Sequence, residues 1–239
     1  MIRRRSRRVC GVWAIGLAML LPGPATAVDI ERDGLRWRCE RLLGDNDCVG
    51  KITVTDPDGH LFSSTRVDIG GGRIRWSGPM TESFPDGSRR HCAATSPTKG
   101  LCVGAVTDTG ADGATVTGTR EIRDDRSVWA GKLETRFASG NRERCEAAGL
   151  EVALCMGPTE FIWANGNRRN GTQRVVDDQE VWIGPVVETL VDGRKLHCAA
   201  VLANGSCDGP ARWVLADGSE RLTRFAEGRE QVSEPLAVP

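Results

Sequence analysis

The segment Asp86-Gly87-Ser88-Arg89-Arg90-His91-Cys92 recurs 106 residues later as Asp192-Gly193-Arg194-Lys195-Leu196-His197-Cys198. The final cysteine of each segment belongs to a stricter pattern, since Cys39, Cys92, Cys145 and Cys198 are each 53 residues apart. A second cysteine follows each of them after eight or nine residues, at Cys48, Cys102, Cys155 and Cys207. A self-similar period of this length indicates a repeat architecture.

The N-terminus has the features of a secretory signal. Five arginines lie within residues 2–8, an apolar run extends over 9–21, and small residues precede position 27. A charged start, a short apolar segment and a small-residue ending predict a signal peptide over 1–27, exported by the general or the twin-arginine route. The remaining residues, 28–239, number 212, which is four times 53.

Removal of residues 1–27 changes the charge balance. The whole chain has 32 basic and 32 acidic residues, and loss of five arginines leaves 27 basic against 32 acidic. The mature chain is therefore acidic, so we expect no nucleic acid partner. The apolar run of 13 residues lies within the signal, and we expect no membrane span in the mature chain.

Export accounts for the cysteines. The chain has nine cysteines, and removal of Cys10 with residues 1–27 leaves eight, an even number that predicts disulfides outside the cytoplasm. The repeat selects the pairs Cys39–Cys48, Cys92–Cys102, Cys145–Cys155 and Cys198–Cys207. Zinc binding is the alternative role for paired cysteines, but these cysteines lack the short spacing of structural zinc sites. We therefore expect no metal and no cofactor.

A shorter rhythm lies within each repeat. Turn-forming pairs ending in glycine recur every 25 to 28 residues, at Asp33-Gly34, Asp58-Gly59, Asp86-Gly87, Asp112-Gly113, Ser139-Gly140, Asn165-Gly166, Asp192-Gly193 and Asp217-Gly218. Such pairs tolerate the positive φ of two-residue hairpin turns. Alternating stretches such as 50–55 flank them and predict strands. The pattern predicts eight hairpins in series.

Tryptophan follows the same period. Trp76-Ser77-Gly78, Trp129-Ala130-Gly131 and Trp182-Ile183-Gly184 are 53 residues apart. Rings at equivalent places in stacked repeats favour a row inside the core. The alternative is a binding row of Trp76, Trp129 and Trp182 on the surface, as sugar-binding proteins use.

The segment Asp112-Gly113-Ala114-Thr115-Val116-Thr117-Gly118 resembles the D-G-x-x-Y-x-G core of MORN repeats. The Trp-x-Gly segments resemble a variant of the same motif, with units of about 26 residues. This resemblance implies an elongated array of stacked β-hairpins that acts as an interaction or scaffolding module. We therefore predict an all-β fold of four disulfide-closed tandem units over 28–239. The alternative is a small four-bladed β-propeller.

The expected two-residue turns also predict which side chains face one another. They place Glu82 opposite His91 and Glu188 opposite His197. The same rule pairs Asp29 with Arg38, whereas the third unit has Thr135 opposite Arg144. A Glu–His pair can transfer protons near neutral pH, so these four residues are catalytic candidates. Arginine at the equivalent places favours a simple cross-strand pair. The inference depends on the turn length, because a shift of one residue moves every side chain to the other face.

Together these observations predict a non-enzymatic protein, periplasmic or secreted, from a bacterium. Its expected role is an interaction or scaffold module of the cell envelope, with an envelope protein or a glycan as partner. The sequence leaves two alternatives open. One is a carbohydrate-binding protein, and the other is a small hydrolase that uses a Glu–His pair.

Overall fold

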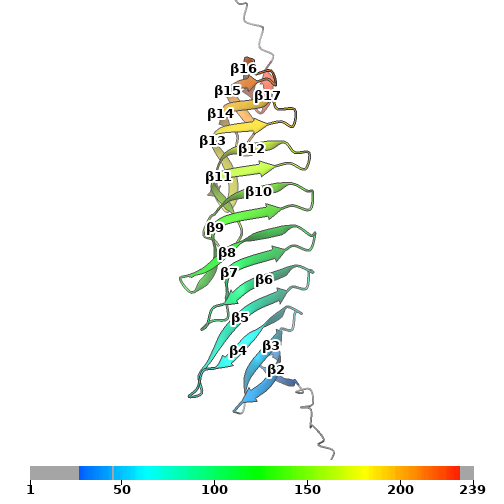
Figure 1. The fold of residues 1–239 in the computed structure, drawn as a ribbon, viewed down its shortest axis with the longest axis vertical. Helices are drawn as coiled ribbons and strands as arrows, with labels where there is room; N and C mark the ends of the chain where they lie inside the picture. Colours follow the sequence, from blue (N-terminus) through cyan, green and yellow to red (C-terminus); the bar gives the residue numbers. More distant parts are fainter. Residues whose placement is uncertain (1–26, 45, 232–239) are drawn as a thin grey trace, which may run out of the picture.

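The computed structural model describes residues 27–44 and 46–231, which form one antiparallel sheet of 17 strands (Figure 1). The expected signal peptide lies outside the described residues, apart from its last position. The strands are β1 (Val28–Arg32), β2 (Leu35–Leu43), β3 (Asp47–Thr55), β4 (Leu61–Asp68), β5 (Ile74–Ser83), β6 (Arg89–Thr95), β7 (Cys102–Thr109), β8 (Thr115–Arg123), β9 (Arg126–Arg136), β10 (Arg142–Ala147), β11 (Cys155–Ile162), β12 (Arg168–Val176), β13 (Gln179–Thr189), β14 (Lys195–Val201), β15 (Cys207–Val214), β16 (Glu220–Ala226) and β17 (Arg229–Gln231).

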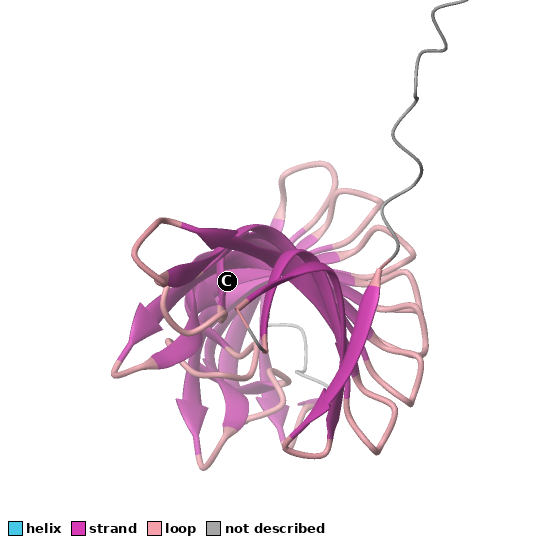
Figure 2. Cartoon of the chain, turned by 90° about the horizontal axis from the view of Figure 1, so that it is seen from below, coloured by secondary structure: helices cyan, strands magenta, loops and turns pink. Residues whose placement is uncertain are grey.

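Each strand pairs with the next one along the chain, so the hairpins follow one another along the length of the molecule. The expectation of an elongated all-β array is confirmed. The sheet is open, with β1 and β17 at its two ends, and the alternative of a closed propeller is wrong. Viewed along the long axis, the sheet is twisted, and the turns along one edge fan out in different directions (Figure 2).

The turns along this edge contain the predicted glycine pairs, but seven of the eight have three-residue loops. In the turn between β5 and β6, the Phe84 N–H donates to Ser88 O and the Gly87 N–H donates to Phe84 O, both at 2.9 Å. Gly87 has φ 90°. This is a type I turn followed by a glycine in the left-handed region. The turn at Asp33-Gly34 alone has the expected two-residue form, because Arg32 pairs directly with Leu35.

The glycines of the Trp-x-Gly and Cys-x-Gly segments interrupt the strands. They have φ between +65° and +88° and lie within odd-numbered strands, at Gly50, Gly78, Gly104, Gly131, Gly157, Gly184 and Gly209. A register shift lies close to each of them, where the odd-numbered strand pairs with the strand before it. Bulges of this kind bend a strand and increase its twist. Each such strand therefore has two limbs, one running to the turn edge and one running to the opposite edge.

The core includes a row of buried side chains on one face of the turn-side limb. Register places them opposite one another from strand to strand, as in Met80–Cys92–Val106 and Val186–Cys198–Ala211. All six are at most 7% exposed. The next residue along each strand points to the other face, so the buried row implies an outward row beside it.

Among the described residues, no helix is long and apolar enough to cross a membrane.

Candidate functional site

The eight cysteines beyond residue 27 form four disulfides that join neighbouring strands. The bonded pairs are Cys39–Cys48, Cys92–Cys102, Cys145–Cys155 and Cys198–Cys207, with Cα atoms 5.4 to 5.6 Å apart. All eight side chains are buried. Each bond joins an even-numbered strand to the odd-numbered strand that follows it, and closes the loop between these two strands.

The expected Glu–His pairs are not formed, so this part of the register prediction is wrong. Glu82 pairs with Arg90, and His91 pairs with Thr81. Because the turn holds three residues rather than two, the register moves by one position and the two side chains point to opposite faces. The alternation of buried and exposed residues agrees, since His91 is exposed beside the buried Cys92.

The fourth unit repeats this displacement. Glu188 pairs with Leu196, and His197 pairs with Val187. In the third unit Thr135 faces Glu143 instead of Arg144. The expected pairing of Asp29 with Arg38 is correct, because the first unit has the two-residue turn.

Glu82 instead belongs to a charged cluster on the core side of the sheet. Arg90 donates two hydrogen bonds of 2.8 Å to Asp108 and one of 3.2 Å to Glu82. The Asp108 carboxylate raises the pKa of Arg90 above its ordinary value. A histidine does lie near Glu82, but it is His60, whose Nε2 is 4.0 Å from the carboxylate. No sequence pattern indicates this approach, because it depends on the pairing of β4 with β5.

The three periodic tryptophans lie against the loop between the cysteines of the following disulfide. Their backbone N–H groups donate to that loop at 2.9 to 3.0 Å, in the pairs Trp76–Pro97, Trp129–Leu150 and Trp182–Ala203. Trp129 is 1% exposed and Trp182 is 8% exposed, while Trp76 is half-buried. Arg66 and Arg120 lie over the rings of Trp76 and Trp129. These hydrogen bonds therefore join each tryptophan strand to the following disulfide loop, and the two buried rings are shielded from a ligand in solvent.

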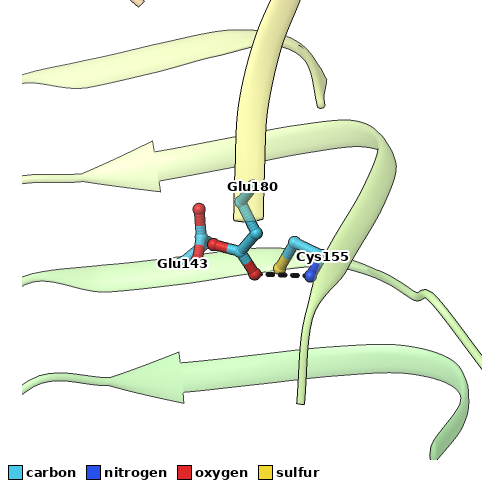
Figure 3. A group of neighbouring side chains, drawn as sticks. All are labelled: Glu143, Cys155 and Glu180. Carbon is cyan, nitrogen blue, oxygen red and sulfur yellow. Dashed lines mark hydrogen bonds between the residues drawn. The ribbon is translucent and has the colours of Figure 1, made fainter. Parts of the chain in front are cut away.

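A buried acidic cluster occupies the third unit (Figure 3). The Cys155 N–H donates to Glu180 at 2.5 Å, and Gln173 Nε2 donates to Glu143 at 3.1 Å. Burial raises the pKa of Glu143 to about 7, and the nearby charge of Glu180 adds to this effect. Burial likewise raises the pKa of Glu180.

These carboxylates and the Cys155 sulfur lie within 4.8 Å of one another. The sulfur is bonded to Cys145, however, and a disulfide sulfur is not the thiolate that binds metals. In the oxidised chain, the cluster therefore does not offer a thiolate-based metal site.

The outward face of the turn-side limb repeats most regularly in charge. A basic residue occurs at one repeat position in all four units, at Arg36, Arg89, Arg142 and Lys195. Two residues later each unit has an arginine or a histidine, at Arg38, His91, Arg144 and His197. The first series lies three residues before the periodic cysteines and the second lies one residue before them, so all eight point away from the buried row. We call these two series the basic rows.

Two surface grooves lie beside the basic rows in equivalent places. One, in the third unit, is lined in part by Lys132, Arg144 and Pro158. The other, in the fourth unit, has Pro185, His197 and Pro210 at the corresponding positions. The equivalent positions of the second series are evident in the sequence, whereas the first series was missed, although the same 53-residue period was sufficient to find it. The face to which they belong became evident only with the register.

Comparison with solved structures gives distant similarities. The SAS-4 TCP domain of Drosophila melanogaster, in complex with a proline-rich motif of Ana2, is 13% identical, with 91% of this chain and 97% of that chain covered and a TM-score of 0.39. The TCP10 domain of Danio rerio CPAP, in complex with a peptide of STIL, is 12% identical over 87% and 98%, with a TM-score of 0.36. The CPAP G-box domain is 15% identical over 72% and 97%, with a TM-score of 0.33. Likeness at this level carries no information about what this chain binds.

No protein-family model matches the chain, so the resemblance to MORN repeats is not a family assignment. No curated protein matches it either.

Proposed function

We propose that this chain is an exported, non-catalytic interaction module that presents one repeated sheet face to an extended partner in the cell envelope. The observation that carries the proposal is the outward face of the turn-side limb. It continues across the antiparallel strands, and its basic residues recur at the same position of every unit. A surface of this kind suits a long partner better than a small ligand, because equivalent contacts recur along the array.

The compartment is part of the proposal. Four buried disulfides are typical of proteins that fold in an oxidising environment. Residues 1–27 have the composition of a secretory signal. Fusion of the full chain to alkaline phosphatase tests export, since that enzyme is active only where its own disulfides form. We expect activity from the full fusion and none from a fusion that begins at residue 28.

Site-specific photocrosslinking in cells tests the interaction. A photoreactive amino acid replaces Thr81, which is exposed on the outward face of β5. The matched control replaces Arg75, which is also exposed and lies on the other limb of the same strand. We expect adducts of higher mass from position 81 and few or none from position 75. Equal labelling from the two positions, or none from position 81, contradicts the proposal.

A further inference from the structure

The outward face of β2–β8 combines basic and hydroxyl side chains without a carboxylate in its two central rows. Strand pairing aligns the first row as Arg38, Thr53, Ser63, Thr81, His91 and Thr107. The second row runs parallel to it from Arg36 through Thr55, Leu61 and Ser83 to Arg89 and Thr109. The basic pairs of β2 and β6 are thus joined by a band of mainly serine and threonine.

The carboxylates of the same two rows lie outside this band. Asp29 and Glu31 are on β1, and the next ones along the sheet are Glu134 on β9, Glu160 on β11 and Glu220 on β16. The last three form ion pairs with neighbouring arginines on this face, at 2.8 to 3.7 Å. By contrast, Arg36, Arg38 and Arg89 form no ion pair with any described residue. Asp29 and Glu31 face Arg38 and Arg36 in register but form no ion pair with them, so the three guanidinium groups can still bind an anionic partner.

We propose that the outward face of β2–β8 binds a linear anionic polysaccharide that runs along the long axis of the sheet. This inference rests on the proposed interaction function and names the class of partner. The cationic side chains complement carboxylate or sulfate groups, and the serine and threonine hydroxyls complement the hydroxyls of the sugar. At about 4.8 Å per strand, the basic pairs of β2 and β6 are roughly 19 Å apart along the axis. A polymer with anionic groups along its length reaches both pairs.

The charge at the turn edge favours this direction. The turns between β3–β4, β5–β6 and β7–β8 carry exposed carboxylates at Asp58, Asp86 and Asp112. They form a negative border beside the basic rows, which disfavours an anionic chain that runs parallel to the strands toward this edge. An anionic chain is therefore favoured along the rows.

The twist of the sheet favours a polymer over a membrane surface as the partner. Even at the low end of normal twist, about 10° per strand, four strands turn the second basic pair by roughly 40° relative to the first. The fan of turns in Figure 2 shows the same progressive rotation. Both pairs therefore cannot lie flat on one plane, whereas an extended polymer follows the twist.

Binding of the oxidised chain to alginate and heparin, measured by calorimetry over a range of salt concentrations, tests the proposal. Neutral dextran and vesicles of phosphatidylglycerol serve as alternative ligands. The test variant is Arg36→Gln/Arg38→Gln/Arg89→Gln. The control variant, Arg41→Gln/Arg73→Gln/Arg75→Gln, removes the same charge from exposed positions beyond the bends. Circular dichroism confirms that both variants are folded.

We expect at least one anionic polysaccharide to bind, with an affinity that falls as salt rises, and dextran not to bind. The test variant weakens binding about tenfold or more, because exposed charge contacts are individually weak and three are lost together. The control variant weakens it less than twofold. Absence of binding to both polysaccharides, equal weakening by the two variants, or binding to vesicles alone overturns the inference. Adducts from position 81 without polysaccharide binding would support the proposed interaction function and contradict only the choice of a polysaccharide as partner.

Discussion

Gly205 and Gly218 have nearly the same backbone conformation in different surroundings. Their φ angles are +81° and +83°. A Cβ atom at Gly218 would meet nothing within 4 Å, whereas one at Gly205 would lie 2.9 Å from Trp182 Cδ1 and would also overlap Arg169. Gly205 therefore combines a turn requirement with close packing against a periodic tryptophan, and Gly218 has the turn requirement alone.

We expect Gly218→Ala to lower the free energy of unfolding by about 1 kcal/mol, the usual cost of a side chain at positive φ. Gly205→Ala should cost about 1–3 kcal/mol more, because the added methyl displaces the ring or the guanidinium. Urea denaturation monitored by circular dichroism measures both values. Equal costs for the two substitutions would show that the loop does not pack on Trp182.

Glu143 makes stability depend on pH. Its pKa of about 7 in the folded chain lies above its ordinary value of 4.5, so the folded chain binds more protons than the unfolded chain between these pH values. The contribution of Glu143 to stability is therefore fully present below about pH 4.5. It is lost as the pH rises through 7, where the buried carboxylate must ionise.

Glu143→Gln removes this ionisation while the amide oxygen still accepts from Gln173. We expect the variant to be more stable than the native chain by about 1–3 kcal/mol at pH 8 and to differ little at pH 5. Glu146→Gln, at an exposed position of the same strand, is the control and should have no such pH dependence. An equal effect of Glu143→Gln at both pH values would exclude the buried, protonated state.

At the scale of the strand, one extra turn residue decides which side chains meet. The three-residue turn between β5 and β6 places Arg90 in the cluster with Glu82 and Asp108 and places His91 in the outward row. Two adjacent residues therefore have different environments, which provides a direct test of the register.

We expect Arg90→Ala to lower the free energy of unfolding by about 1.5–3 kcal/mol, since it removes charged hydrogen bonds and leaves half-buried carboxylates without their partner. His91→Ala should change stability by no more than about 0.5 kcal/mol, as for an exposed substitution away from the core. Thermal or urea unfolding of the two variants gives the comparison. A larger effect at His91 than at Arg90 would support the two-residue register instead.

At the scale of the whole molecule, the described strands pair only with their neighbours in the chain, and the two ends of this sheet form no pairing with each other. Stability in such an array is close to a sum of unit terms and nearest-neighbour terms. Loss of one disulfide should therefore weaken its own unit, by about 2–3 kcal/mol for a loop of this length.

The double variant Cys198→Ala/Cys207→Ala tests this locality. We expect hydrogen exchange to accelerate in β14–β16 and to remain within about twofold of native rates in β2–β5, because no contact transmits the loss over that distance. Uniform acceleration in all strands would instead identify a single cooperative unit.

Much of this architecture was predictable because repeats express their period directly in the sequence. The spacing of Cys39, Cys92, Cys145 and Cys198 identified four units, and the glycine pairs located the turns. The candidate site was less predictable. Asp-Gly is compatible with both two-residue and three-residue turns, so local sequence does not determine the register that separates Glu82 from His91.

The sequence by itself determined the number of units, the places of the turns and the partners of the cysteines, since each follows from periodic positions and local backbone preferences. The tertiary structure alone decided that the array remains open and that His60, rather than His91, approaches Glu82. It also decided that Arg36, Arg38, Arg89 and their repeats share one outward face. These features depend on bends, twist and strand register, which arise only when neighbouring strands pair.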